Sequence, residues 1–184
     1  MPSPPSPFRY VVLLRAVNLG PVNKLPMAEL RRICIEAGGG DVQTYIQSGN
    51  VVLSSTLDEP SLKATLEAAI AAESGLATDV TIRTAAEMAR VVDLLPYPDA
   101  DPTHLHVGFA AAPPSAEAQA AIAAIDLAPE EVTVVGRDIY LYLPNGMGRS
   151  KVPGQMGRRL GQPVTVRNWR TVTTLRAMAL EPPA

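Results

Sequence analysis

The chain has 184 residues, of which 47% are hydrophobic and 18% are charged, and its formal net charge at pH 7 is -2. This length and composition are enough to bury a core, in one large domain or in two small ones. No apolar run approaches the ~18 residues of a membrane-spanning helix, and the opening MPSPPSPFRY lacks a secretory signal pattern, so we expect a cytoplasmic protein with no membrane partner.

The first half of the chain predicts six elements in the order strand, helix, strand, strand, helix, strand. Hydrophobic periodicity and turn residues place them at 10–15, 27–37, 42–47, 50–55, 61–73 and 80–83. The first helix begins after Pro26 and ends at a run of three glycines. Cys34, the single cysteine, excludes an internal disulfide and agrees with a reducing compartment. Its helical spacing from Met27 and Leu30 predicts a buried thiol.

The second half repeats this order after a linking helix at 85–95 and a turn-rich loop. Its elements are predicted at 104–109, 115–125, 132–135, 139–143, 153–160 and 164–167, and a final helix follows at 171–179. The predicted fold class is therefore α+β, with two ferredoxin-like (α/β-plait) subdomains of βαββαβ order and an internal duplication. The predicted boundaries are a disordered N-terminus at 1–8, a first plait at 9–84, a linker at 85–103 and a second plait with the C-terminal helix at 104–184.

The first predicted hairpin has a polar outer face. If Ser48 and Gly49 form a two-residue turn, Ile46 pairs with Val51 on the face that the helices cover. Side chains alternate along a strand, so the opposite face collects Gln43, Tyr45, Gln47, Asn50, Val52 and Ser54.

The second predicted hairpin also places tyrosines on its outer face. A turn around Arg137-Asp138 pairs Val134 with Leu141 inside and leaves Tyr140 and Tyr142 outside. A sheet face with aromatic side chains suits the stacking of nucleic-acid bases. The alternative is that this face is covered by another surface of the protein or by a dimer partner.

Charge is distributed unevenly along the chain. Residues 139–180 contain seven basic residues and no acidic one, so this block carries +7. The rest of the chain holds the other 9 basic residues and all 18 acidic residues, which gives -9. A block of one sign suggests an anionic partner, and the alternative is that it docks on the acidic part of the same chain.

A glycine-rich turn, LPNGMGRSKVPGQMG, lies between a predicted strand and a predicted helix. Arg149, Ser150 and Lys151 lie in this turn, where backbone N–H groups and the positive end of the helix dipole favour an anion. The spacing is not that of a P-loop, and the alternative is that Ser150 only caps the helix. At the end of the last strand, Arg167 suits phosphate or carboxylate and Asn168 can cap the final helix.

The loop after the first strand is long for a plait and carries Arg15, Asn18 and Lys24. A polar loop in this position often carries function. His104 and His106 are too few for a metal site, so we predict no metal and expect both on a solvated strand face. No catalytic set can be assigned from spacing, so the sequence names neither a reaction nor a cofactor.

Five motifs, LLRAVNLG, NKLPMAELR, TYIQSGNVV, LYLPNGMGRSK and RNWRTV, together closely resemble the bacterial family catalogued as domain of unknown function 1697. The resemblance extends from Tyr10 to Met178 and implies two linked α/β-plait subdomains, with no established activity, cofactor or partner. Two positions depart from the family pattern, where Ala16 replaces a glycine and Thr174 replaces a lysine. The candidate ligand-binding residues match the family pattern and are too polar for a core: Arg15, Asn18, Lys24, Tyr45, Gln47, Ser48, Asn50, Arg149, Ser150, Lys151, Arg167 and Asn168.

These observations predict that the two plaits enclose a polar, positive site for a phosphate-bearing small molecule or nucleotide. If residues 149–151 cradle the anion, we expect the backbone N–H groups of this turn to lack partners within the protein, with Arg167 or Lys24 close by. One alternative is sequence-independent binding of single-stranded nucleic acid, although the net charge of -2 and the 4% aromatic content count against it. The other is a protein-interaction module without a small-molecule ligand.

Overall fold

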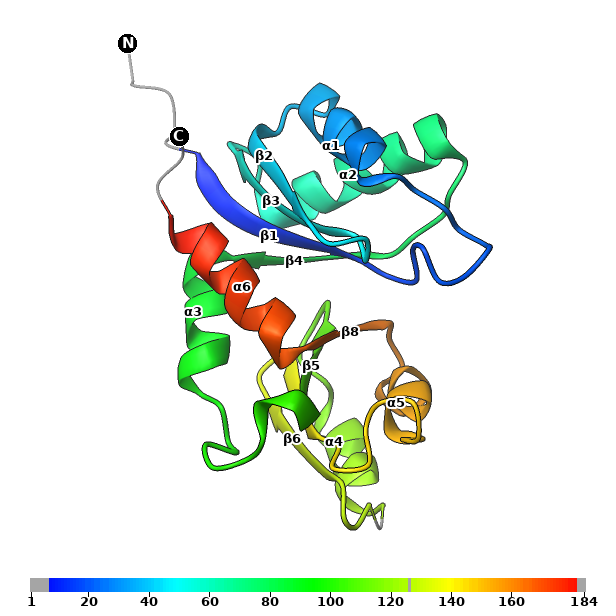
Figure 1. The fold of residues 1–184 in the computed structure, drawn as a ribbon, viewed down its shortest axis with the longest axis vertical. Helices are drawn as coiled ribbons and strands as arrows, with labels where there is room; N and C mark the ends of the chain where they lie inside the picture. Colours follow the sequence, from blue (N-terminus) through cyan, green and yellow to red (C-terminus); the bar gives the residue numbers. More distant parts are fainter. Residues whose placement is uncertain (1–6, 126, 182–184) are drawn as a thin grey trace. The chain divides into compact units, whose positions relative to one another are not determined.

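The structure, a computed structural model, describes residues 7–125 and 127–181 of the chain (Figure 1). The chain forms two compact units, with boundaries after Ala89 and after Thr174. The second unit consists of residues 90–174, and the residues from Leu175 onward belong to the first unit. Residues 1–6 of the predicted disordered N-terminus lie outside the described residues. None of the described helices is long and apolar enough to cross a bilayer.

The first unit contains a four-stranded antiparallel sheet in the order β2-β3-β1-β4. Its strands are β1 (Phe8–Leu14), β2 (Gly40–Tyr45), β3 (Asn50–Ser55) and β4 (Val80–Thr84), and its complete helices are α1 (Met27–Glu36) and α2 (Glu59–Ser74). Both helices lie on one face of the sheet (Figure 1). Helix α2 begins two residues before its predicted start because the Asp58 carboxylate accepts a 2.9 Å hydrogen bond from the Ser61 backbone N–H, which caps the first turn.

The core of the first unit lies between this sheet and its two helices. Alternate residues of the strands meet the apolar stripes of α1 and α2, and the buried set is Tyr10, Val12, Leu14, Val17, Leu25, Leu30, Ile33, Cys34, Val42, Val51, Leu53, Leu62, Leu66, Ile70, Val80 and Ile82. The prediction of a buried Cys34 is confirmed. Burial raises the pKa of this thiol to about 12, so the thiol stays protonated at neutral pH.

The second unit repeats the arrangement, with sheet order β6-β7-β5-β8. Its strands are β5 (Leu105–Ala110), β6 (Glu131–Val135), β7 (Asp138–Tyr142) and β8 (Val164–Asn168), and its complete helices are α4 (Ala116–Ala123), α5 (Val152–Leu160) and the short 3-10 helix η1 (Pro102–His104). Helices α3 (Ala85–Asp93) and α6 (Trp169–Leu180) each cross a unit boundary. The predicted fold class, two α/β plaits of βαββαβ order with a linking helix and a C-terminal helix, is confirmed.

Helix α5 packs closely on the second sheet at a glycine. A Cβ atom at Gly108 would lie 2.8 Å from Cγ1 of Val164 and 3.3 Å from Cε of Met156, so only glycine leaves room for these neighbours. The core on this face consists of Ala110, Ile122, Ile139, Leu141, Leu143, Val152, Met156, Leu160 and Val164. This packing fixes α5, and with it the residues just before the helix.

The first hairpin differs from its predicted register. Tyr45 pairs with Asn50 and Thr44 with Val51, so residues 46–49 form a four-residue connection. The prediction that Ile46 pairs with Val51 in the core is therefore wrong, and Ile46 is 50% exposed with φ 47°. Gly49 fixes the connection, because its carbonyl accepts a 2.8 Å hydrogen bond from the backbone N–H of Leu14 and a Cβ atom would come within 2.8 Å of the Leu14 side chain.

The register of the second hairpin also differs by two residues from the predicted register. Val135 pairs with Asp138, so the two turn residues are Gly136 and Arg137, and Val134 faces Ile139 in place of the predicted Leu141. Gly136 supplies the positive φ, 61°, that such a turn requires. A slip of two residues preserves the side-chain alternation, so the predicted faces are unchanged for the paired strand residues of both hairpins, whereas Ile46 and Gln47 lie outside the strands.

Candidate functional site

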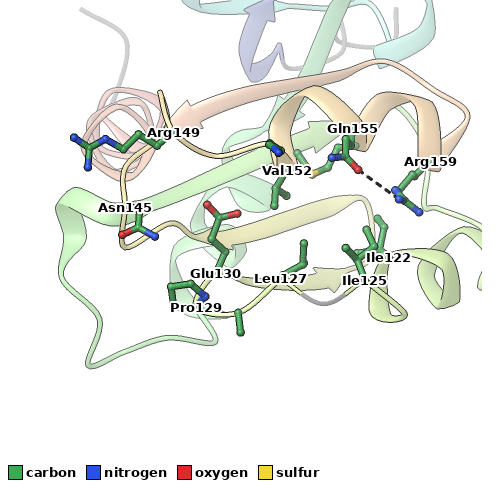
Figure 2. A pocket seen from close by; sticks show the side chains of 13 residues that line it. Ile122, Ile125, Leu127, Pro129, Glu130, Asn145, Arg149, Val152, Gln155 and Arg159 are labelled. Atoms are coloured by element: carbon green, nitrogen blue, oxygen red, sulfur yellow. Dashed lines mark hydrogen bonds between the residues drawn. The ribbon is translucent and has the colours of Figure 1, made fainter.

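A cavity of about 290 Å³ lies in the second unit. Two segments form it, the end of α4 with the approach to β6, and the turn after β7 with helix α5 (Figure 2). The lining residues are Ile122, Ile125, Leu127, Ala128, Pro129, Glu130, Asn145, Arg149, Lys151, Val152, Gln155, Met156 and Arg159. The pocket therefore combines an apolar wall with several polar and charged groups.

Three cationic side chains line this pocket. Arg149 and Lys151 come from the glycine-rich turn, and Arg159 comes from the last turn of α5. Arg149 and Arg159 lie at opposite ends of the pocket, and the Arg149 guanidinium extends away from Glu130 (Figure 2). Among residues 7–125 and 127–181, none of the three cations forms an ion pair. No described carboxylate therefore lies within ion-pair distance of these three cations.

One carboxylate lines the pocket and is held in place. The Ser150 hydroxyl donates a 2.9 Å hydrogen bond to Oε2 of Glu130, and the Ser150 oxygen accepts one of 3.1 Å from the backbone N–H of Val152. Ser150 thus connects Glu130 to the first residue of α5, as a short polar residue at a helix start can do.

The glycine-rich turn does not offer the expected backbone cradle. The backbone N–H of Arg149 donates to the carbonyl of Gly146 at 3.1 Å, and that of Ser150 donates to the carbonyl of Met147 at 3.3 Å. The prediction that these groups lack partners is wrong, because the turn closes on its own carbonyls. Side chains of the turn, rather than its backbone, reach the pocket.

The two remaining candidates of the second unit lie outside the pocket. Arg167 of β8 pairs with Val107 of β5, and burial lowers the pKa of its guanidinium to about 10. The Asn168 side chain accepts a 2.8 Å hydrogen bond from the backbone N–H of Thr171 and caps α6, as predicted. The structure therefore places Arg149 and Lys151 at one cavity, with Ser150 beside them. Arg167 and Asn168 do not line this cavity.

Asn18 organises the candidate residues of the first unit. Its side-chain amide donates to the carbonyls of Leu25 at 2.9 Å and Gln47 at 2.8 Å, and its oxygen accepts a 2.8 Å hydrogen bond from the backbone N–H of Leu25. Asn18 thus holds the loop after β1 against the β2–β3 connection. The hydrogen bonds of its side-chain amide are therefore made to backbone groups.

Asn50 plays a similar part at the start of β3. It is fully buried, and its amide donates to the carbonyl of Tyr45 at 3.0 Å and to the hydroxyl of Ser48 at 2.8 Å. Arg15 is exposed and pairs with Asp79 at 3.3 Å. Lys24 is also exposed. Of the candidates in this unit, the two asparagines support the loops, and Arg15 and Lys24 lie at the surface.

The tyrosines of the second sheet are not available for stacking. Tyr140 is 1% exposed, and its hydroxyl donates a 2.8 Å hydrogen bond to the carbonyl of Val91. The Tyr142 ring lies 6.2 Å from that of Tyr97, whose hydroxyl is 2.8 Å from the Thr133 hydroxyl. The end of α3 and the residues after it therefore cover this face, which removes the main support for base stacking.

The expectation of a solvated histidine face is wrong for His106, which is 8% exposed. It lies on β5 opposite Leu141 and Asn168, on the face that α5 covers. Within the described part of the chain, no group of three or more His, Cys, Asp or Glu side chains is placed to hold a metal ion.

Sequence reasoning missed Glu130 and Arg159 at the pocket. Arg159 could have been found, because Val152, Gln155 and Arg159 recur at helical spacing and so share one side of α5. Glu130 carries no such signal. It lines the pocket because residues 127–130, which precede β6, lie across the cavity from α5.

The fold defines an α+β protein with one plait in each of two units. The chain belongs to the family described as protein of unknown function (DUF1697), whose sequence model matches residues 8–140, so the expected family is confirmed. The motifs at 141–151 and 167–172 lie beyond the matched residues. The solved structure of a conserved bacterial protein from Streptococcus pneumoniae is similar, with 21% sequence identity, a TM-score of 0.72, and coverage of 96% of this chain and 100% of that chain. At this identity, the likeness shows the fold alone. No curated protein matches the chain.

Proposed function

We propose that the second unit binds a phosphate-bearing small molecule in the pocket between the 122–130 segment and α5. The observation that carries this proposal is that Arg149, Lys151 and Arg159 line one cavity and form no ion pair within the described residues. Cations that share a partly enclosed cavity favour an anion more strongly than the same cations spread over an open surface. The proposal assigns binding and no reaction.

The pocket differs from a general basic surface by its apolar wall. Ile122, Leu127 and Met156 lie on the same cavity as the cations. Small-molecule sites usually combine an apolar lining with a few placed polar groups. The ligand is therefore expected to have an apolar part beside its phosphate. The free thiol of Cys34 is consistent with our proposal that the protein binds this ligand in the cytoplasm.

We also propose that the two units arose by internal duplication. Their strand orders correspond element by element. Arg83 of β4 pairs with Val11 of β1, and Arg167 of β8 pairs with Val107 of β5, so each sheet carries an arginine at the same position of its ladder.

Replacing Lys151 by Gln tests the proposed site. Thermal-shift screening with nucleotides, sugar phosphates and coenzyme fragments should first identify a stabilising compound, since a ligand at 100 times its Kd adds about 2.7 kcal/mol. Lys151→Gln should then weaken binding of that compound by about 1–3 kcal/mol, the range of a charge-assisted hydrogen bond, in calorimetric titration. The melting temperature of the unliganded protein should change little, because Lys151 is exposed.

Arg158→Gln is the matched control, because Arg158 lies next to Arg159 on α5, is exposed and does not line the pocket. It removes the same charge and should leave the affinity within a factor of about two, since its contribution is screened by solvent. Equal losses in the two variants would show that only net charge matters and would contradict a defined site. No stabilising compound in the screen would contradict the proposal as a whole.

A further inference from the structure

Glu130 is the pocket residue that a simple anion site does not explain. A carboxylate beside the phosphate would repel it, yet Glu130 is fixed by the Ser150 hydroxyl at 2.9 Å. This bond occupies only one of its carboxylate oxygens in the described structure. An ionised carboxylate accepts hydrogen bonds and donates none, so a ligand that hydrogen-bonds to Glu130 must present hydrogen-bond donors.

The charges of the lining limit what those donors can be. The described lining carries three positive charges and the one negative charge of Glu130, a sum of +2. A phosphomonoester carries about -1.5 to -2 at neutral pH, which balances this sum when the rest of the ligand is neutral. Neutral hydroxyl donors therefore fit better than an ammonium group, which would leave the pocket with an excess of positive charge.

The order of groups along the pocket suggests how the ligand is arranged. In Figure 2, Glu130 lies between the end that carries Arg149 and the end that carries Ile122 and Ile125, where Arg159 also lies. A ligand that follows this order has an anionic end, hydroxyl groups in the middle and an apolar body. A volume of about 290 Å³ is at the small end of ligand sites, which suits one such unit rather than two.

We infer that the pocket accepts a nucleoside monophosphate, with its phosphate at the Arg149–Lys151 end, its ribose hydroxyls donating to Glu130, and its base against Ile122, Ile125 and Leu127. This inference rests on the proposed phosphate site. A sugar phosphate offers the same anion and hydroxyls but has no apolar body for the wall. The base provides that body because its face is broad and weakly hydrated.

The experiment compares four ligand types on the full-length protein by calorimetric titration. They are the common ribonucleoside monophosphates, their dideoxy counterparts that lack both ribose hydroxyls, ribose phosphate, and inorganic phosphate. We expect at least one ribonucleotide to bind about tenfold or more tightly than its dideoxy counterpart, because losing the donors leaves a placed carboxylate without its partners. It should also bind more tightly than ribose phosphate.

Glu130→Gln should reduce the preference for the ribonucleotide about threefold or more, because a neutral acceptor forms weaker hydrogen bonds than a carboxylate. Glu131→Gln is the control, since Glu131 is exposed, adjacent and outside the pocket, and it should keep the full preference. Equal binding of the ribo and dideoxy forms, a preference that survives Glu130→Gln, or tighter binding of ribose phosphate would overturn the inference and leave the phosphate site standing. Failure of every phosphate compound to bind would overturn both.

Discussion

Asn18 shows how a single side chain can hold a loop that has no regular structure. It occupies the left-handed region with φ 56°, and its backbone N–H donates a 2.8 Å hydrogen bond to the carbonyl of Asn23. Asparagine tolerates this conformation better than other residues with a Cβ atom, because its short amide can bond locally. The polarity of Asn18 is therefore explained by the loop itself.

We expect Asn18→Ala to lower the free energy of unfolding by about 2–3 kcal/mol, from lost hydrogen bonds of about 1 kcal/mol each and from left-handed strain. Asn18→Gly loses the same bonds but relieves the strain, so it should be about 1 kcal/mol less destabilising. Urea unfolding of both variants measures the difference. Equal stability of the two variants would mean that the φ of Asn18 carries no strain.

His106 is a buried titratable residue outside the pocket. Its Nδ1 has no hydrogen-bond partner in the described structure. Burial lowers the pKa of the imidazole, and a hydrogen bond to the backbone of His104 acts in the opposite direction. Since the pKa of His106 is lower in the folded chain, the unfolded chain takes up the proton first as the pH falls.

The stability that neutral His106 provides should be complete above about pH 6.5 and should decrease as the pH falls below that value, by at most about 1.4 kcal/mol per pH unit. His106→Gln should flatten this slope, whereas His104→Gln should leave it in place. Urea unfolding at several pH values checks this. A slope that is unchanged in His106→Gln would show that other groups cause it.

At the scale of elements, the connection between β2 and β3 combines strain and close packing. Ile46 adopts φ 47°, which is unfavourable for a β-branched residue, although half of its surface is exposed. Burial therefore does not account for isoleucine here. Backbone strain in a place without a packing reason is often associated with function, and the candidate residues Gln47 and Ser48 follow directly.

Ile46→Asn should raise the free energy of unfolding by about 1 kcal/mol, because asparagine accepts the left-handed conformation at lower cost and little apolar contact is lost. Differential scanning calorimetry would show a higher melting temperature. The control is Val22→Asn, which also exposes an amide in place of a surface apolar residue but at a position without positive φ, and it should have little effect. A destabilised Ile46→Asn would show that the isoleucine makes a stabilising contact.

At the scale of the whole molecule, the two units divide the basic block. Arg149, Lys151, Arg158, Arg159, Arg167 and Arg170 belong to the second unit, whereas Arg176 belongs to the first. This division follows from α6, which crosses the unit boundary between Thr174 and Leu175. The pocket draws only on Arg149, Lys151 and Arg159, so the other four basic residues of the block lie outside it.

The order and type of the elements, the helix-covered faces and the burial of Cys34 could all be predicted from the sequence alone. These depend on local propensity and on the period of apolar residues, which a single chain displays directly. The bounds of β3 were predicted to the residue, and α1 differed only at its end. The family was also evident from the motifs. The faces of the paired hairpin residues were predicted correctly, although both registers were two residues off and Ile46 was wrongly placed in the core.

Which polar residues lie next to one another could not be predicted from the sequence and became clear from the folded chain. Asn18, Asn50 and Asn168 looked like ligand residues but bond the backbone of loops and a helix end. Arg167 is half-buried and Tyr140 is buried. Glu130 and Arg159 line the pocket with Arg149 and Lys151. The physical reason is that polarity records a need for a hydrogen-bond partner without saying which one, and the packing of distant segments supplies that partner.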